Sequence, residues 1–257
     1  MKNFYVFEGT DGSGKTTLSR EITNIINMFE DNKVIYTREP GGSNVKASEE
    51  IRSLILKDSM GTIESETEYL LYLSSRKEHI EKFIKPNSIK NKIVLCDRFN
   101  DSSLAYQGYA KGGDVTKLEN ISKLVIGDSY PDYTFFIDIN PELGIQRIMS
   151  NRKNEVNRLD RMSNDFYYKV YNAYKSIIKK NPKKYFIIDG TLEIKINATI
   201  ISYLLLNDYL VNFNYSKIKK TIDKIYKVII DKNLFLCSKQ SLQENKKIFN
   251  LILKEAL

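Results

Sequence analysis

The chain has 257 residues, of which 42% are hydrophobic and 28% are charged, enough for one α/β domain with a buried core and a small appendage. No run of 18 or more apolar residues occurs, so the sequence predicts no transmembrane helix. The net charge of +8 is concentrated in residues 210–257, which hold ten lysines against four acidic residues. Residues 1–209 are therefore nearly neutral, which argues against binding of nucleic acid or another polyanion by the body of the protein.

The first residues lead directly into a strand-like segment, so we expect no signal peptide. Cys96 and Cys237 lie far apart in the sequence and are expected to be reduced thiols. Both features predict a cytoplasmic protein.

Five short apolar runs recur along the chain, each rich in β-branched or aromatic residues, as is typical of strands buried on both faces. Helical stretches separate them, among them 15–29, 66–84 and 165–180. Strands that alternate with helices predict a parallel, doubly wound sheet, in which ligands bind beyond the carboxyl ends of the strands. The five runs are Asn3–Glu8, Lys33–Thr37, Lys92–Asp97, Tyr133–Asp138 and Tyr185–Asp189.

A complete phosphate-loop pattern, GxxxxGK[ST], follows the first run and opens a helix. Its glycines let successive backbone N–H groups point at phosphate oxygens, and the helix adds its positive end. Lys15 is expected to reach the β- and γ-phosphates of ATP, and the Thr16 hydroxyl to bind Mg²⁺. The residues expected to hold the ATP phosphates are Gly9, Thr10, Asp11, Gly12, Ser13, Gly14, Lys15, Thr16 and Thr17.

Polar segments also follow the second and third runs. Residues 37–42 read TREPGG, and residues 97–108 read DRFNDSSLAYQG. Asp97 ends a strand of the Walker B type and is expected to act on Mg²⁺ or its water shell. Arg98 follows it at the edge of the sheet where ligands bind.

In the helical stretch 66–84, Tyr72 and Arg76 lie four residues apart and therefore share one helix face. His79, the only histidine, comes one turn later. Because phosphoryl transfer needs no catalytic histidine, we expect His79 to be a partly exposed helix residue.

Asn140 before Pro141 predicts a helix N-cap after the fourth run. At the other end of the chain, residues 210–257 carry two apolar stripes with helical spacing, and Ser241 with Glu244 fits a capping box. We expect a pair of amphipathic helices docked on the body; contact with a partner or with nucleic acid is the alternative.

The phosphate loop, TREPGG and DRFNDSSLAYQG together closely resemble thymidylate kinases, whose REPGG element and DR[FYH]xxSxxA[FY]Q signature recur here in order. The resemblance covers roughly residues 1–205. It implies a P-loop NTPase fold with a five-stranded parallel sheet flanked by helices, ATP-dependent phosphorylation of dTMP to dTDP for dTTP synthesis, Mg²⁺ as cofactor, and a homodimer. It divides the chain into a kinase-like domain, residues 1–209 with a lid at about 147–162, and a basic helical extension, residues 210–257.

The resemblance also implies roles at the acceptor site. Arg98 and Arg52 would bind the acceptor phosphate and offset its repulsion by ATP, and Asp11 would contact the region of the sugar 3′-hydroxyl. Tyr72, where phenylalanine is more usual, would stack on thymine. The residues expected to bind dTMP, among them Arg76 at the base and Tyr106 against the deoxyribose, are Asp11, Glu39, Pro40, Arg52, Tyr72, Arg76, Arg98, Ser102, Ser103, Tyr106 and Gln107.

Some members of this family carry an arginine in the phosphate loop, where this chain has Gly12 and Ser13. Members without it supply the positive charge from the lid. We therefore expect Arg158 and Arg161 to be catalytic beside Lys15, Arg98 and Asp11, and the further lid candidates are Arg147 and Arg152.

Two alternatives remain open. A kinase of the same fold could act on another nucleotide such as dUMP, or on a deoxyribonucleoside. A nucleotide-bound scaffold or nucleic-acid-binding protein could instead act through its basic tail, although the intact Lys15, Asp97 and Arg98 argue against it.

Overall fold

The computed structural model describes residues 2–42, 45–57, 61, 63–151, 163–208, 210 and 215–256. Its centre is a five-stranded sheet in the order β2-β3-β1-β4-β5, and every neighbouring pair of strands is parallel. The predicted fold class is confirmed. The strands are β1 (Phe4–Glu8), β2 (Val34–Arg38), β3 (Ile93–Asp97), β4 (Tyr133–Asp138) and β5 (Tyr185–Asp189).

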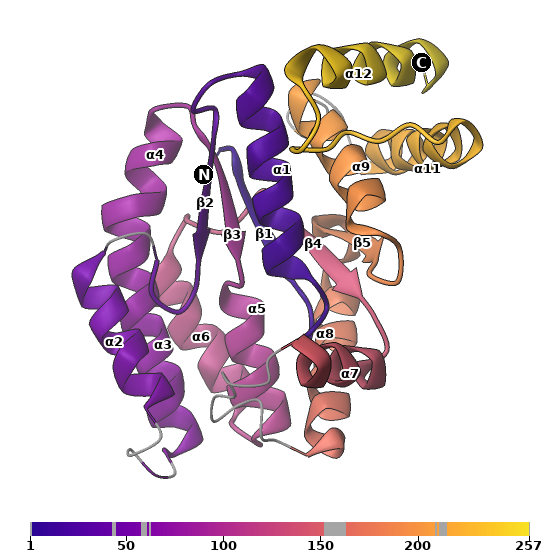
Figure 1. Cartoon of the computed structure of the whole chain (residues 1–257). Helices are drawn as coiled ribbons and strands as arrows, with labels where there is room; N and C mark the ends of the chain where they lie inside the picture. Colours follow the sequence, from indigo (N-terminus) through magenta and orange to yellow (C-terminus); the bar gives the residue numbers. More distant parts are fainter. Residues whose placement is uncertain are drawn as a thin grey trace.

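Helices cover both faces of the sheet (Figure 1). On one face, α1 (Lys15–Phe29) and α9 (Ile194–Leu206) share a core cluster with side chains of all five strands. The opposite face is covered by two smaller clusters, to which α3, α6, α8 and the π-helical segments contribute. The remaining elements up to residue 206 are α2 (Lys46–Leu56), α3 (Ser65–His79), η2 (Ile80–Ile84), α4 (Lys85–Ile89), α5 (Asn100–Ser103), η3 (Leu104–Ala110), α6 (Val115–Ile126), α7 (Pro141–Asn151), α8 (Asn164–Lys180) and η4 (Pro182–Lys184).

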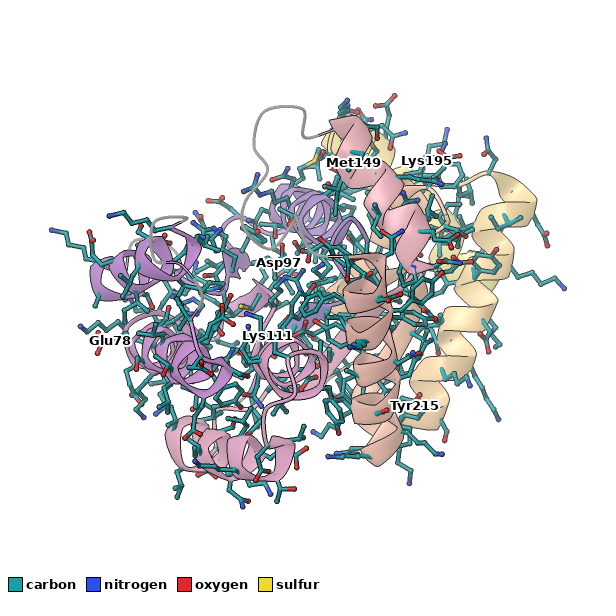
Figure 2. The ribbon with its side chains drawn as sticks, turned by 90° about the horizontal axis from the view of Figure 1, so that it is seen from below. Glu78, Asp97, Lys111, Met149, Lys195 and Tyr215 are labelled. Carbon is teal, nitrogen blue, oxygen red and sulfur yellow. The ribbon has the colours of Figure 1, made fainter. Side chains whose placement is uncertain are left out.

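The pairing register brings three strand ends together. Asp97 is paired with Phe7 of β1 on one side and with Arg38 of β2 on the other. The loops that follow these three strands therefore begin side by side at the carboxyl edge. Figure 2 looks at this edge from below and shows Asp97 between α3, marked by Glu78, and α7, marked by Met149.

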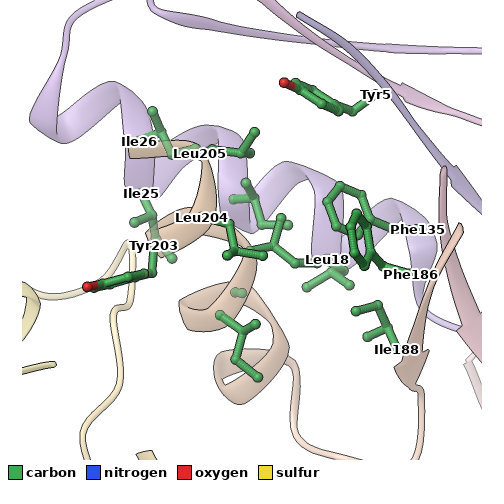
Figure 3. Packing of buried hydrophobic residues seen from close by; sticks show 14 of the residues in the cluster. Tyr5, Leu18, Ile25, Ile26, Phe135, Phe186, Ile188, Tyr203, Leu204 and Leu205 are labelled. Carbon is green, nitrogen blue, oxygen red and sulfur yellow. The ribbon is translucent and has the colours of Figure 1, made fainter. Parts of the chain in front are cut away.

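Beyond α9, the chain forms α11 (Tyr215–Lys232) and α12 (Leu242–Ala256), which lie next to α1 and α9 (Figure 1). Buried isoleucines of α11 and α12 belong to the same cluster as the core residues of α1 and α9, part of which is drawn in Figure 3. The Phe249 ring lies 5.5 Å from that of Phe29 and 5.2 Å from that of Tyr203. The backbone N–H and hydroxyl of Ser238 donate to Glu21, at 2.7 and 2.6 Å.

Two helix starts follow the local chemistry expected of them. The Glu142 N–H donates to Asn140 Oδ1 at 3.0 Å, so Asn140 caps α7. At α12, the Glu244 N–H donates to Ser241 Oγ at 3.2 Å and the Ser241 N–H donates to Glu244 Oε2 at 2.9 Å, which is a capping box.

Among the described helices, none is both long and apolar enough to cross a lipid bilayer. Cys96 is buried, Cys237 is partly buried, and both are free thiols.

The packing of α11 gives a stability prediction. Ile225 is 0% exposed in the cluster shared with α1 and α9, whereas Ile230 on the same helix is 47% exposed. Ile225→Ala should lower the free energy of unfolding by about 2–5 kcal/mol, because it leaves a cavity, and Ile230→Ala should change it by no more than about 0.5 kcal/mol. Urea unfolding of both variants would measure this, and equal effects would show that α11 does not contribute to the core.

Candidate active site

A cavity of about 710 Å³ opens at the carboxyl edge of the sheet. It brings together segments from the phosphate loop, the TREPGG loop, α3 and the DRFNDSS segment, as the sequence predicts for a parallel sheet. The predicted site residues that line it are Asp11, Gly12, Gly14, Lys15, Thr16, Thr17, Glu39, Pro40, Arg52, Tyr72, Arg76, Asp97, Arg98, Ser102, Ser103, Tyr106 and Gln107. Gly9, Thr10 and Ser13 lie behind this wall and contact Lys15.

Lys15 begins α1 and is only 5% exposed. Its ammonium donates to the carbonyl oxygens of Gly9 and Thr10, at 3.0 and 2.8 Å, and to the Ser13 hydroxyl at 3.3 Å. Burial, with the nearby positive charge of Arg98, lowers the pKa of Lys15 to about 8. An anionic ligand in the cavity would favour the charged form of this lysine.

The phosphate loop packs against α7 through two glycines. A Cβ atom on Gly12, whose φ is +75°, would lie 2.1 Å from the Gly144 carbonyl oxygen. A Cβ on Gly144 would in turn lie 2.5 Å from the Asp11 carbonyl oxygen. No side chain, an arginine at residue 12 included, fits at either position without movement of the backbone.

Asp97 and Thr16 meet in the cavity wall. The Thr16 hydroxyl donates to Asp97 Oδ2, while Asp97 Oδ1 is buried and has no hydrogen-bond partner among the described residues. A buried carboxylate oxygen without a partner, next to a hydroxyl, offers the hard oxygen ligands that Mg²⁺ prefers. These two residues therefore fit a magnesium ion.

Arg98 connects the third strand to the phosphate loop. Its backbone φ of +71° places it in the left-handed region. Its guanidinium donates to Asp11 Oδ1 at 2.5 Å and to the Ser102 hydroxyl at 3.0 Å, and lies over the Tyr106 ring. Burial alone would lower the pKa of Arg98, but Tyr106 and Asp11 outweigh it and hold that pKa well above its usual range. Arg98 is therefore a fixed cation at the cavity.

Glu8, at the end of β1, is a site residue that sequence reasoning missed. Its buried carboxylate accepts the Phe99 N–H at 2.8 Å, the Ser102 N–H at 3.2 Å and the Ser102 hydroxyl at 2.6 Å, and also the Tyr174 hydroxyl at 2.8 Å. Burial raises its pKa. Glu8 thus anchors the start of α5 behind Arg98. The sequence shows only that an acidic residue closes an otherwise apolar run, and not what this residue binds.

Arg76 lies on α3, is 1% exposed and donates from Nε to Glu39 Oε2 at 2.6 Å. Its Nη1 donates to Asn100, and its Nη2 donates to the Phe99 carbonyl and the Ser103 hydroxyl. These contacts with described residues use four of the five guanidinium N–H groups and leave one on Nη1 for a ligand.

The expectation for His79 is wrong. Its side chain is fully buried, and its ring nitrogens lie 3.0 Å from Glu39 Oε1 and 2.7 Å from the Thr37 hydroxyl. The single helix predicted over residues 66–84 is divided at this point: α3 ends at His79, and η2 follows with π-helical hydrogen bonding.

Two arginines meet at the TREPGG loop. Nη1 of Arg52 and Nη1 of Arg38 both donate to the Pro40 carbonyl oxygen, at 2.9 and 3.0 Å. Burial and the neighbouring charge of Arg38 lower the pKa of Arg52. Arg38, which the sequence interpretation did not single out, contributes to a region of the cavity wall suited to a doubly charged anion.

The lid residues Arg152, Arg158 and Arg161 lie outside the described residues. Arg147 on α7 lines the cavity and donates to the Gly190 carbonyl oxygen at 3.0 Å. Residues 190–193, between β5 and α9, and Ile194 at the start of α9 complete this wall. They carry no motif that could have indicated it.

The chain is similar to known thymidylate kinases over most of its length. The family model described as thymidylate kinase matches residues 7–201. The thymidylate kinase of Bacillus velezensis is 41% identical over 188 residues, which is 73% of this chain and 87% of that protein. The thymidylate kinase of Clostridium novyi is 43% identical over 182 residues, covering 70% and 87%. The crystal structure of thymidylate kinase from Ehrlichia chaffeensis is 35% identical with a TM-score of 0.63, covering 79% of this chain and 97% of that chain.

The contact between Gly12 and Gly144 can be tested by Gly144→Ala. Helix propensity alone would make this change stabilising by about 1 kcal/mol. Because the new Cβ would lie 2.5 Å from the Asp11 carbonyl oxygen, we expect lower thermal stability and about tenfold weaker ATP binding, the weakening that corresponds to about 1.4 kcal/mol. Differential scanning fluorimetry and titration with a fluorescent ATP analogue measure both. A higher melting temperature with unchanged ATP affinity would refute the contact.

Proposed function

The chain belongs to the thymidylate kinase family, and we propose that it phosphorylates dTMP to dTDP in the cavity at the carboxyl edge of its sheet, with ATP as the donor. The observation that carries the proposal is that one cavity is lined both by Gly14–Thr17 of the phosphate loop and by the acceptor elements with Arg98, Arg52 and Arg76. A nucleotide-bound scaffold would need only the first of these two sets.

Transfer requires two anionic substrates to approach each other in line. Lys15 holds the β- and γ-phosphates, while Arg98 and Arg52 hold the acceptor phosphate. Asp11 accepts from Arg98 at 2.5 Å and from the Tyr106 hydroxyl at 2.7 Å, so the acceptor side is fixed before substrate binds. Such positioning supplies much of the catalysis in this class of reaction.

Thr16 and Asp97 are the residues that would hold Mg²⁺. When bound, the ion neutralises charge on the β- and γ-phosphate oxygens.

Thymidylate is the acceptor that the cavity suits. Tyr72 lines the wall next to Arg76, where its ring can stack on a base and the free Nη1–H of Arg76 can donate to a base carbonyl. Tyr106, held by Asp11 and Arg98, would disfavour a 2′-hydroxyl on the acceptor. Ser103 and Gln107 complete this side of the wall.

We also propose a homodimer in the cytoplasm. Leu54 on α2, Leu70 on α3 and Leu124 on α6 are exposed, and these helices pack against one another in that order. Exposed apolar side chains on adjoining helices support a contact between two copies. The two free thiols, Cys96 and Cys237, suit a reducing compartment.

Lys15→Ala should lower kcat with dTMP and ATP by at least about a hundredfold, because it removes a charge that acts on the reacting phosphates. The exposed lysine Lys227 on α11 provides the control, since Lys227→Ala should leave kcat unchanged. A coupled ADP-release assay measures both rates, with circular dichroism to confirm folding. The same assay run with dTMP, dUMP, dCMP and thymidine separates this proposal from a kinase for another acceptor, which would prefer a different substrate.

The lid gives a second prediction. Since the Gly144 carbonyl oxygen closes the space beside Gly12, the additional cation at the γ-phosphate must come from another segment. We expect at least one of Arg152→Ala, Arg158→Ala and Arg161→Ala to lower kcat by about a hundredfold, with KM for dTMP changed only a few-fold, as expected for charge stabilisation in the transition state. Arg158 is the first choice. Near-normal turnover of all three variants would move this role to Arg147.

A further inference from the structure

His79 is a buried polar side chain that the transfer itself does not use. It is 0% exposed at the end of α3, three residues after Arg76. Nδ1 lies 3.0 Å from Glu39 Oε1, and Nε2 lies 2.7 Å from the Thr37 hydroxyl. Burying an imidazole is unfavourable unless its nitrogens are bonded, and here both nitrogens are.

The partner of His79 is also the partner of Arg76. Glu39 faces His79 with Oε1 and accepts from Arg76 Nε with Oε2 at 2.6 Å. A terminal carboxylate rotates easily about its last bond, so one contact alone would leave its plane poorly defined. With both oxygens held, the carboxylate has one orientation, and so has the guanidinium bonded to it. A continuous set of contacts thus runs from Thr37 through His79 and Glu39 to Arg76.

The surroundings of His79 hold its ring in place. The ring stacks on Phe83 with centroids 5.6 Å apart and planes 22° apart. Gly42 also lies against the ring, because a Cβ atom there would be 2.5 Å from Nε2. The π-helical segment η2 begins directly after His79, and such segments are often found at functional sites. The second glycine of TREPGG is therefore required by the position of the histidine.

Cys96 lies beside this pair, and one ligand atom each from Glu39, His79 and Cys96 falls within 4.8 Å of the others. These residue types can bind zinc. However, both Glu39 oxygens and both His79 nitrogens already have protein partners, and the Cys96 thiol donates to the Arg98 carbonyl oxygen at 3.1 Å. The cluster is complete as a hydrogen-bond network.

We infer that His79 is a positioning residue for base recognition: it fixes Glu39, and Glu39 fixes the guanidinium of Arg76 at the cavity wall. The inference rests on the proposed function, because Arg76 is the residue expected to read the base. Thymine presents a carbonyl oxygen at the position where cytosine presents an amino group. A guanidinium held in one orientation favours the carbonyl, whereas a loosely held one discriminates less. His79 thereby determines specificity without touching the substrate.

The test uses substitutions that separate the two ring nitrogens. His79→Asn places an amide N–H near the position of Nδ1 and can donate to Glu39, whereas His79→Gln reaches towards Thr37. His79→Phe keeps an aromatic ring against Phe83 and removes both hydrogen bonds.

For His79→Phe and His79→Gln we expect KM for dTMP to rise about tenfold, which corresponds to the loss of one charge-assisted hydrogen bond. KM for ATP should stay within about twofold. The ratio of kcat/KM for dTMP to that for dCMP should fall by a similar factor. His79→Asn should restore KM for dTMP to within about threefold of the wild type.

A double-mutant cycle with Glu39→Gln tests the route of the effect. If His79 acts through Glu39, then His79→Phe should change KM for dTMP by less than about twofold in the Glu39→Gln background. Ile84→Val is the structural control, since it removes a buried methyl group from the same π-helical segment and should lower the melting temperature while KM for dTMP stays unchanged.

The measured activities distinguish a failure of the proposed function from a failure of the role assigned to His79. A wild-type protein that does not phosphorylate dTMP would overturn the proposed function. A wild-type protein that does, together with an unchanged KM and unchanged dTMP to dCMP ratio in His79→Phe, would overturn this inference alone. Equal KM values for dTMP in His79→Asn and His79→Gln would also overturn this inference, even if His79→Phe did not fold.

Discussion

The pairing register of β1, β3 and β2 determines where the charged groups of the cavity lie. Phe7, Asp97 and Arg38 stand opposite one another across the three strands. The phosphate loop, Arg98 and Glu39 therefore start from neighbouring points on one edge. A slip of one residue in either pairing would turn the alternate side chains to the other face of the sheet. Because these strands are buried, their register fixes both the core side chains and the charged residues that follow the strand ends.

The cations at this edge differ in what balances them. Arg98 is paired with Asp11, and Arg76 is paired with Glu39, so both are held in place without a ligand. Lys15 donates only to carbonyl and hydroxyl oxygens among the described residues, and its pKa is lowered to about 8. The arginines are therefore preorganised by the protein, whereas the lysine is the group whose charge an anionic ligand would stabilise most. This division suits an enzyme that must bring two anions together without binding either one irreversibly.

The sequence was sufficient for the fold and for most of the residues that line the cavity, Arg38 and residues 190–194 excepted, because both depend on local patterns. Apolar runs marked the strands, and the GxxxxGK[ST] pattern and two polar segments after strands marked the site. His79, Glu8 and Gly144 could not be found in this way. The helix that carries His79 also buries Glu68 and Arg76, so its hydrophobic periodicity does not tell which polar residues face inward.

The other two depend on packing between segments far apart in the chain. The buried position of Glu8 is explained only by the hydrogen-bond donors at the start of α5 and on α8. The need for glycine at residue 144 is explained by the backbone of the phosphate loop, more than 130 residues away in the chain. Their roles follow from tertiary contacts, which no local window of the sequence contains.

The segment beyond the matched range 7–201 packs on the helix that carries the phosphate-binding lysine. Lys15 begins α1, whereas the contacts of α1 with the extension, through Glu21 and Phe29, lie further along the same helix. A helix transmits displacement along its axis, but α1 is also buried against the sheet through residues such as Leu18 and Ile22. Leu18 lies nearer to Lys15 along the helix than Glu21 or Phe29 does. The extension should therefore contribute more to the stability of α1 than to the geometry of the phosphate loop.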